Sequence, residues 1–180
     1  MEIPGKYVIL FIGTAALAAA VFAWTFQYQR GRRILALWGA DNARLIRVDA
    51  KQITLLELST ENVVDSESLT IDGETHFITR RLDITKARGI IHARQALIED
   101  GSFQWDRPRG DCNAHWQYAL RFTQGPRQAT VLFDTNCQRA KLLESGSQAA
   151  IVPKIFEGWL KFIDEQIPET SNDGTASPTT

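Results

Sequence analysis

The longest apolar run of the chain lies near its N-terminus. Residues 7–24 read YVILFIGTAALAAAVFAW and contain no charged side chain. At about 1.5 Å per residue, a helix of this length spans about 27 Å, close to the roughly 30 Å hydrocarbon core of a bilayer. Tyr7, Trp24 and Tyr28 stand near its two ends, where amphipathic rings favour the level of the lipid headgroups. The pattern predicts one transmembrane helix over residues 7–28.

A cleaved signal peptide is the main alternative to this anchor. The apolar run of a signal peptide is normally about 7–15 residues long and ends at a small-x-small site. Here the run is longer, and residues 18–20 are followed by Val21, Phe22 and Trp24 rather than by a polar mature start. An uncleaved anchor is therefore predicted, which places the chain at the cell membrane with the lipid bilayer as a partner. A buried helix of a soluble core is disfavoured by the length of the run.

Two signals disagree about the side of the membrane on which the domain lies. Arg30, Arg32 and Arg33 follow the apolar run, whereas Lys6 precedes it. This imbalance favours a cytoplasmic domain. The cysteine pair discussed below favours the opposite side, and the prediction leans towards an extracytoplasmic domain.

Beyond residue 40 the apolar positions follow strand and helix periods in turn. Residues 52–59 read as a strand, and Asp72-Gly73 between the β-prone runs 69–72 and 74–82 predicts a hairpin. Helical spacing over residues 85–98 predicts a helix, and a second helix is predicted to begin at Pro153 and to end near residue 167. These elements predict an α+β domain, with an antiparallel sheet of about four or five strands and two or three helices.

The same pattern divides the chain into five parts. They are an N-terminal tail (1–6), the transmembrane helix (7–28), a juxtamembrane helix or linker (29–40), a single α+β domain (41–168) and a disordered tail (169–180).

The two cysteines flank the clearest hairpin of the sequence. One apolar set (Trp116, Tyr118, Leu120, Phe122) and a second set (Ala129, Val131, Phe133) each occupy alternate positions. With residues 123–126 as the loop, Phe122 pairs with Arg127, and the same register places Cys112 opposite Cys137. Opposite residues are close enough for a disulfide, which would indicate an oxidising compartment. The alternative is a pair of reduced, buried thiols.

Composition excludes one class of function and restricts others. The 180 residues include 20 basic and 21 acidic side chains, giving a formal net charge of −1. Without a basic excess there is no electrostatic signature of nucleic-acid binding. Two cysteines are too few for a four-thiolate zinc site.

No sequence motif indicates catalysis, so no catalytic, cofactor-binding or metal-ligating residue is assigned. His76, His92 and His115 form no HxxxH or HExxH spacing, and GxSxG, phosphate-loop and CxxC patterns are absent. Two weaker alternatives assign chemistry to this region. One is a zinc site built from Cys112, His115 and Cys137, and the other is a dithiol switch on the hairpin. Purely structural roles for these residues are favoured over both.

One predicted loop contains a tryptophan close to two arginines. Its sequence, FQWDRPRG, contains Trp105, Arg107 and Arg109, which are the residues predicted to contact a protein partner. The alternative is that Trp105 folds back onto the core.

Two segments carry a resemblance to other proteins. The stretches RRILALWGADNARLIRVDAKQITLLEL and LDITKARGIIHARQALIEDGSFQW resemble parts of uncharacterised bacterial proteins with one N-terminal membrane helix. The resemblance covers less than half of the chain. It implies an anchor-plus-domain layout and no activity.

These observations leave the biochemical function open. The leading hypothesis is a non-enzymatic interaction or accessory module that binds an unidentified protein partner. One alternative is an enzyme whose site is built from distant residues, around His76, His115 or Asp134. The other is a subunit of a membrane complex.

Overall fold

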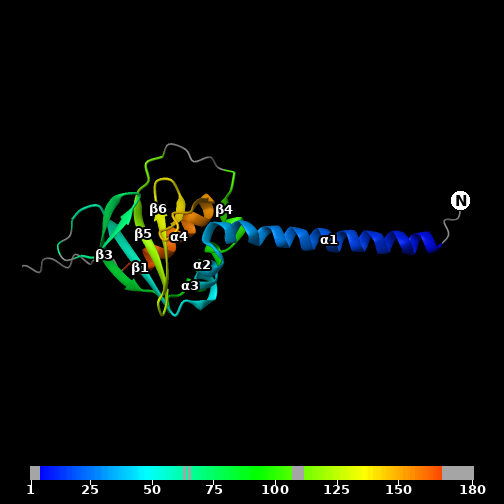
Figure 1. Cartoon of the computed structure of the whole chain (residues 1–180), viewed down its shortest axis with the longest axis horizontal. Helices are drawn as coiled ribbons and strands as arrows, with labels where there is room; N and C mark the ends of the chain where they lie inside the picture. Colours follow the sequence, from blue (N-terminus) through cyan, green and yellow to red (C-terminus); the bar gives the residue numbers. More distant parts are fainter. Residues whose placement is uncertain (1–4, 63, 65, 107–111, 168–180) are drawn as a thin grey trace, which may run out of the picture.

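A single antiparallel sheet organises the domain, and one long helix extends away from it (Figure 1). The computed structural model describes residues 5–62, 64, 66–106 and 112–167, and for residues 5–10 and 26–30 it describes the backbone only. Within this part of the chain the sheet has eight strands in the order β2-β3-β1-β5-β6-β7-β8-β4. The strands are β1 (Gln52–Ser59), β2 (Ser68–Ile71), β3 (Glu74–Asp83), β4 (Phe103–Gln104), β5 (Trp116–Gln124), β6 (Arg127–Asp134), β7 (Arg139–Leu142) and β8 (Gln148–Ile151).

The helices are α1 (Gly5–Trp38), α2 (Ala40–Arg44), α3 (Ile90–Leu97) and α4 (Pro153–Gln166), with a π-helical turn η1 (Leu45–Asp49) and a 3₁₀ turn η2 (Asp100–Ser102). The α+β class predicted from sequence is confirmed. The predicted size of the sheet, four or five strands, is wrong, because β4, β7 and β8 were not anticipated. These strands have two to four residues, and the sequences of β7 and β8 (RAKL and QAAI) contain a single β-branched residue, so the period-2 signal is weak.

The long helix α1 overturns the predicted membrane anchor. Among the residues that the structure describes, no helix has both the length and the apolar character needed to cross a bilayer. Alanine, glycine and threonine make up nine of the fifteen residues between Phe11 and Thr25, and these side chains add little apolar surface. The predicted transmembrane helix over residues 7–28 and the predicted localisation as a single-pass membrane protein are therefore wrong.

The α1 helix also continues past the predicted boundary at residue 28. It runs without a break to Trp38 and ends at Gly39, whose φ of 76° favours glycine. The predicted boundaries of the two tails stay predictions, because residues 1–4 and 168–180 lie outside the described residues.

The helices lie over one face of the sheet, and this face carries the main core. Leu55, Leu120 and Val131 from neighbouring strands pack there against the buried side chains of Phe156 and Trp159 on α4. The opposite face of the sheet carries a smaller apolar cluster, which consists of Leu56, Leu58, Ile71, Ile78, Trp116, Ala119 and Leu132. The domain therefore buries apolar side chains on both faces of its sheet.

The β2–β3 hairpin folds over this second face. Its turn is formed by Asp72 and Gly73, with φ values of 54° and 89°, which are typical of the two-residue turn predicted for the Asp-Gly pair. Asp72 forms a salt bridge with Lys141 of β7, although β1, β5 and β6 separate β3 from β7 in the sheet. A sheet in which the β2–β3 turn reaches β7 in this way is strongly curved, with the second face on the inside.

The β5–β6 hairpin has a different register from the one predicted. Phe122 pairs with Ala129 and Tyr118 with Phe133, a shift of two residues that leaves the side chains from Tyr118 onwards on their predicted face. Trp116 is the exception: an irregularity in the ladder between Trp116 and Tyr118 places its ring in the cluster on the second face, so its predicted face is wrong. The turn is shortened to Gly125 and Pro126, because β5 continues to residue 124 and β6 begins at residue 127. The pattern of apolar positions defines the face of each strand but not which even-numbered shift the turn selects.

The predicted helix over residues 85–98 begins later than expected. Asp83 accepts hydrogen bonds from the backbone N–H and the hydroxyl of Thr85, so it holds a turn instead of a helix N-terminus. The helix α3 starts only at Ile90, after Gly89 with a φ of 89°.

Candidate functional site

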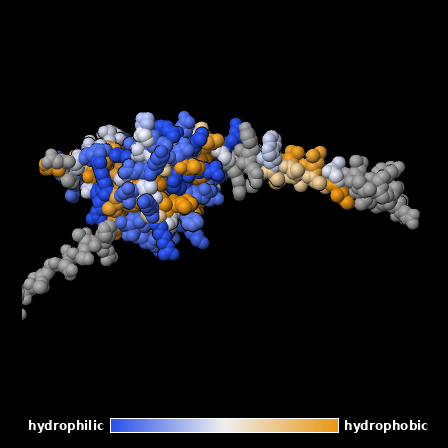
Figure 2. Space-filling view, turned by 90° about the horizontal axis from the view of Figure 1, so that it is seen from below, coloured by the Kyte–Doolittle hydropathy of each residue, from blue (hydrophilic) through white to orange (hydrophobic). Residues whose placement is uncertain are grey.

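The N-terminal part of α1 carries most of the large apolar side chains that are exposed in the described chain. Every side chain from Phe11 to Thr25 is exposed, including Leu17, Phe22 and Trp24. The helix is apolar on all sides rather than along one stripe. Figure 2 shows this stretch as an apolar rod that stands clear of the more hydrophilic surface of the domain. A helix of this kind is normally found covered by other structure.

The two threonines of this stretch make the rod more apolar than its sequence suggests. Thr14 donates its hydroxyl to the carbonyl oxygen of Phe11 at 2.9 Å. Thr25 donates its hydroxyl to the carbonyl oxygens of Val21 and Phe22, each at 2.9 Å. Because these hydroxyls are bonded to their own helix backbone, their hydrogens do not project towards a neighbour.

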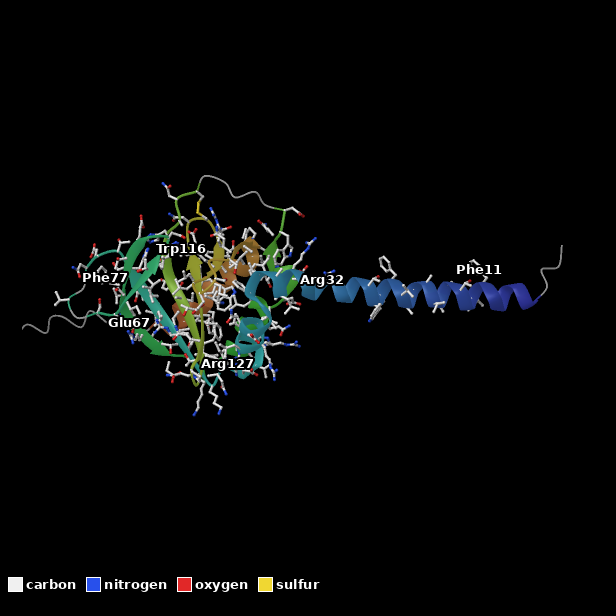
Figure 3. All side chains as sticks on the ribbon, in the orientation of Figure 1. Phe11, Arg32, Glu67, Phe77, Trp116 and Arg127 are labelled. Atoms are coloured by element: carbon white, nitrogen blue, oxygen red, sulfur yellow. A yellow bond between two sulfur atoms is a disulfide. The ribbon has the colours of Figure 1, made fainter. Side chains whose placement is uncertain are left out.

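The other end of α1 is locked into the domain. Ile34, Leu37 and Trp38 are buried in the main core. The indole N–H of Trp38 donates to the carbonyl oxygen of Leu97 at 2.6 Å, and its ring meets the ring of Phe103 edge-on at 5.8 Å. The apolar rod is thus a continuous extension of the domain. In Figure 3, Phe11 lies far out on this rod and Arg32 lies where the rod reaches the domain.

The predicted partner-binding loop is described only in part. Arg107 and Arg109 lie outside the described residues. Trp105 is half-buried: its indole N–H donates to the carbonyl oxygen of Asp100 at 3.0 Å, and its ring lies 5.5 Å from that of Phe103. The guanidinium of Arg33 stands 5.9 Å from the Trp105 ring centroid. These contacts match the alternative in which Trp105 folds onto the core, and the partner role of the three residues stays a prediction.

The structure joins Cys112 and Cys137 in a disulfide, with their Cα atoms 6.0 Å apart. The geometry differs from the predicted one, because the two cysteines do not face each other across a ladder. Cys112 precedes β5, whereas Cys137 lies in the turn between β6 and β7. In the observed register β6 ends at Asp134, so Cys137 lies beyond the ladder. The turn between β6 and β7 brings Cys137 close to Cys112, just before β5.

Asp134 organises this turn. Its side chain is fully buried, and its Oδ1 accepts hydrogen bonds from the backbone N–H groups of His115, Asn136 and Cys137, each at 3.0 Å. Three amide donors on one carboxylate oxygen make Asp134 a structural anchor for the turn that carries Cys137.

The three histidines do not form a common site. His76 is buried on β3, His92 is exposed on α3 and His115 is exposed before β5. Within the described residues, no three histidine, cysteine, aspartate or glutamate side chains are placed to hold a metal ion. The zinc site considered for Cys112, His115 and Cys137 is excluded for this state of the chain, because both thiols are consumed by the disulfide.

Comparisons of the chain with protein-family models, with curated proteins and with solved structures find no match.

Proposed function

We propose that this protein is a non-enzymatic interaction module that assembles through the exposed part of α1. The observation that carries the proposal is the junction between an exposed apolar rod and a domain that buries the other end of the same helix. Hydrophobic burial favours any association that covers the rod. Because α1 is continuous with the domain, a partner on the rod is held at a defined position relative to the domain.

The occupant that we propose is the α1 helix of a second copy. Gly13, Ala16, Ala20 and Ala23 recur at spacings of three, four and three residues, so they fall on one face of the helix. Small side chains let two helix axes approach closely, and the larger flanking Leu17 can then pack over the neighbouring helix. Two identical helices have apolar stretches of equal length. No charged residue occurs between Lys6 and Arg30, so a parallel pair has no like charges side by side along the rod.

Sedimentation equilibrium of the full chain tests this proposal, with two matched variants on the exposed part of α1. Ala20→Glu places a charge on the small-residue face, whereas Ala18→Glu places the same charge on the opposite face. We expect the wild-type chain and Ala18→Glu to self-associate. Ala20→Glu should raise the dissociation constant at least about tenfold, because burying an unpaired carboxylate costs more than about 1.4 kcal/mol.

Three outcomes would contradict the proposal. The wild-type chain could sediment as a monomer at its highest soluble concentration. The two variants could weaken assembly equally, which would indicate association without a preferred face. The monomeric chain could instead bind phosphatidylcholine vesicles through α1.

A further inference from the structure

The second face of the sheet, which faces away from the helices, has a polar half beside its apolar cluster. The register places four side chains in one row across neighbouring strands: Asp83 of β3, Thr54 of β1, Arg121 of β5 and Thr130 of β6. A second row consists of Gln52, Thr123 and Gln128. The apolar half of the face is covered by the β2–β3 hairpin, whereas the polar half lines an open cavity of about 420 Å³. The sheet thus presents a polar concavity that its own core does not fill.

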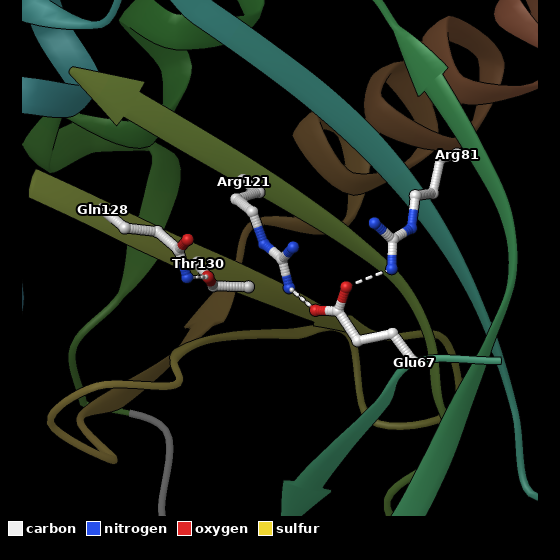
Figure 4. A network of polar contacts seen from close by, with 5 residues as sticks. All are labelled: Glu67, Arg81, Arg121, Gln128 and Thr130. Atoms are coloured by element: carbon white, nitrogen blue, oxygen red, sulfur yellow. Dashed lines mark hydrogen bonds and ion pairs between the residues drawn. The ribbon is translucent and has the colours of Figure 1, made fainter. Parts of the chain in front are cut away.

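Two arginines on different strands converge at the border of this cavity. Arg81 of β3 and Arg121 of β5 both bind the carboxylate of Glu67, which lies just before β2 (Figure 4). The distance from Arg121 to Glu67 Oε1 is 3.0 Å. In the sheet, β1 lies between β3 and β5. The two guanidinium groups therefore approach the Glu67 carboxylate from opposite sides. The arrangement shows that this pair of arginines can hold a carboxylate.

The electrostatics of Glu67 agree with this geometry. Partial burial acts to raise the pKa of Glu67, but the hydrogen bonds and positive charges of Arg121 and Arg81 outweigh it and lower the pKa. The Glu67 side chain is nevertheless 43% exposed, so solvent and solutes can reach the ion pair. An ion pair at this exposure contributes little to stability and can be exchanged for another at low cost.

Arg121 has a further donor that Glu67 does not use. Its side chain is 15% exposed, and its Nε is buried without a hydrogen-bond acceptor among the described protein groups. A buried donor without an acceptor costs about 1–3 kcal/mol, so a movement of the Arg121 side chain that brings Nε to an acceptor in the cavity is favoured. Nε and the terminal nitrogens of arginine form a planar fork that matches the two oxygens of a carboxylate.

The other acidic residue of the cavity does not compete for the arginines. Asp83 Oδ1 accepts from the backbone N–H of Thr85 at 2.9 Å and from its hydroxyl at 2.5 Å. This carboxylate is therefore turned to the segment after β3. Thr54, Thr123 and Gln128 remain as neutral hydrogen-bonding side chains on the floor of the cavity.

We infer that this cavity is a binding site for a small polar organic acid. The carboxylate of the ligand binds Arg121 and Arg81 in place of Glu67, and its hydroxyl or amide substituents bond to Thr54, Thr123 and Gln128. Glu67 is the internal competitor of the ligand: it occupies the arginines in the free protein and is displaced on binding. The site lies on the sheet and not on α1, so it is independent of the assembly proposed above.

Isothermal titration calorimetry at constant ionic strength and neutral pH tests the site, with tartrate as the probe and succinate as its counterpart without hydroxyl groups. Tartrate should bind wild-type protein weakly, with a dissociation constant in the millimolar range. Glu67→Gln removes the charge of the internal competitor and should tighten tartrate binding about tenfold. Arg121→Gln should abolish it. Succinate should bind more weakly than tartrate to wild type and to Glu67→Gln.

The matched controls lie on β3 and on its neighbour β1, but on the helix-covered face. Arg80 of β3 and Glu57 of β1 form an ion pair there, with 3.7 Å between Arg80 Nε and Glu57 Oε2. Arg80→Gln and Glu57→Gln should leave tartrate binding unchanged.

Arg121 is largely buried, so its replacement can disturb folding. Arg81→Gln is the second variant, because the Arg81 side chain is 48% exposed, and it should weaken tartrate binding while the unfolding midpoint stays near that of wild type. Absence of saturable tartrate binding to both wild type and Glu67→Gln would overturn the inference. Equal effects of the Arg81→Gln and Arg80→Gln variants would overturn it as well.

Discussion

His76 is a buried ionisable residue on the concave face of the sheet. It lies opposite Leu69 in the β2–β3 hairpin and is only 4% exposed. Neither of its ring nitrogens has a hydrogen-bond partner among the described residues. Burial lowers the pKa of His76 below its ordinary value, although the charges of Glu74 and Asp72 oppose this shift and that of His115 adds to it. The folded protein therefore favours the neutral form of this imidazole.

A pH dependence of stability follows from the direction of this shift. Between about pH 6.5, where the unfolded chain takes up a proton, and the lower pKa of His76 in the folded chain, the unfolded chain binds more protons, so the free energy of unfolding falls as the pH falls. Above about pH 6.5, His76 is neutral in both the folded and the unfolded chain, so its protonation no longer lowers the free energy of unfolding. His76→Phe should flatten the acid side of the curve in urea unfolding. The exposed His92→Phe control should keep the wild-type slope, and an unchanged slope in His76→Phe would contradict the assignment.

Asp134 gives a second prediction at the residue scale. Its Oδ1 accepts three backbone N–H groups in a fully buried position. Asp134→Ala leaves these donors without an acceptor, and we expect the free energy of unfolding to fall by about 3 kcal/mol. Urea unfolding with the disulfide intact measures this change. A loss below about 1 kcal/mol would show that other groups replace the carboxylate.

At the scale of elements, the disulfide ties the start of β5 to the turn after β6. The two cysteines are 25 residues apart in the sequence. Closing a loop of this size in the unfolded chain is worth about 3.5 kcal/mol in the chain-entropy model. We expect the Cys112→Ala, Cys137→Ala double variant to unfold at a lower urea concentration than the oxidised wild type, with a loss in the free energy of unfolding of about 3.5 kcal/mol. Identical midpoints for the variant and the oxidised wild type would contradict the prediction.

The hairpin also shows what the sequence reveals about elements. Alternation of apolar residues predicts which side of β5 and β6 faces the core, and the Asp-Gly pair predicts the β2–β3 turn. The predicted register of this hairpin is wrong. A shift of two residues keeps a paired side chain on the same face of the sheet, so only the length of the turn distinguishes the alternative registers. The predicted cysteine pair is therefore found in the structure for a reason other than the one expected. The short strands β4, β7 and β8 are stabilised by their neighbours in the sheet, which local sequence does not reveal.

The arginine cavity lies beyond sequence prediction for a related reason. Arg81 and Arg121 are forty residues apart, and they meet because β3 and β5 both pair with β1. Glu67, just before β2, contacts both arginines because the curved sheet brings the β2–β3 hairpin over β1 and β5. The single local signal is that both arginines occupy strand positions opposite to the apolar core set.

At the scale of the whole molecule, Trp38 couples α1 to the domain. Its indole is 1% exposed and reaches α3 and Phe103. Trp38→Ala should lower the free energy of unfolding by about 3–5 kcal/mol, because it leaves a large cavity and an unpaired carbonyl. Phe22→Ala, on the exposed rod, is the matched control and should change it by less than about 0.5 kcal/mol. Comparable losses in both variants, measured by urea unfolding, would show that the rod is packed against the domain in solution.

The unbroken course of α1 gives the protein the mechanics of a lever. Thirty-four helical residues at about 1.5 Å each make an arm of about 50 Å, whose fulcrum is the Trp38 contact with the domain. A rotation of about 5° at this fulcrum displaces the far end by about 4 Å, comparable to the rise of nearly one helical turn. Small repacking beneath Trp38 would therefore appear at the tip as a movement large enough to change which side chains meet. In the reverse direction, a force applied to the tip would be concentrated at the few side chains that surround the fulcrum.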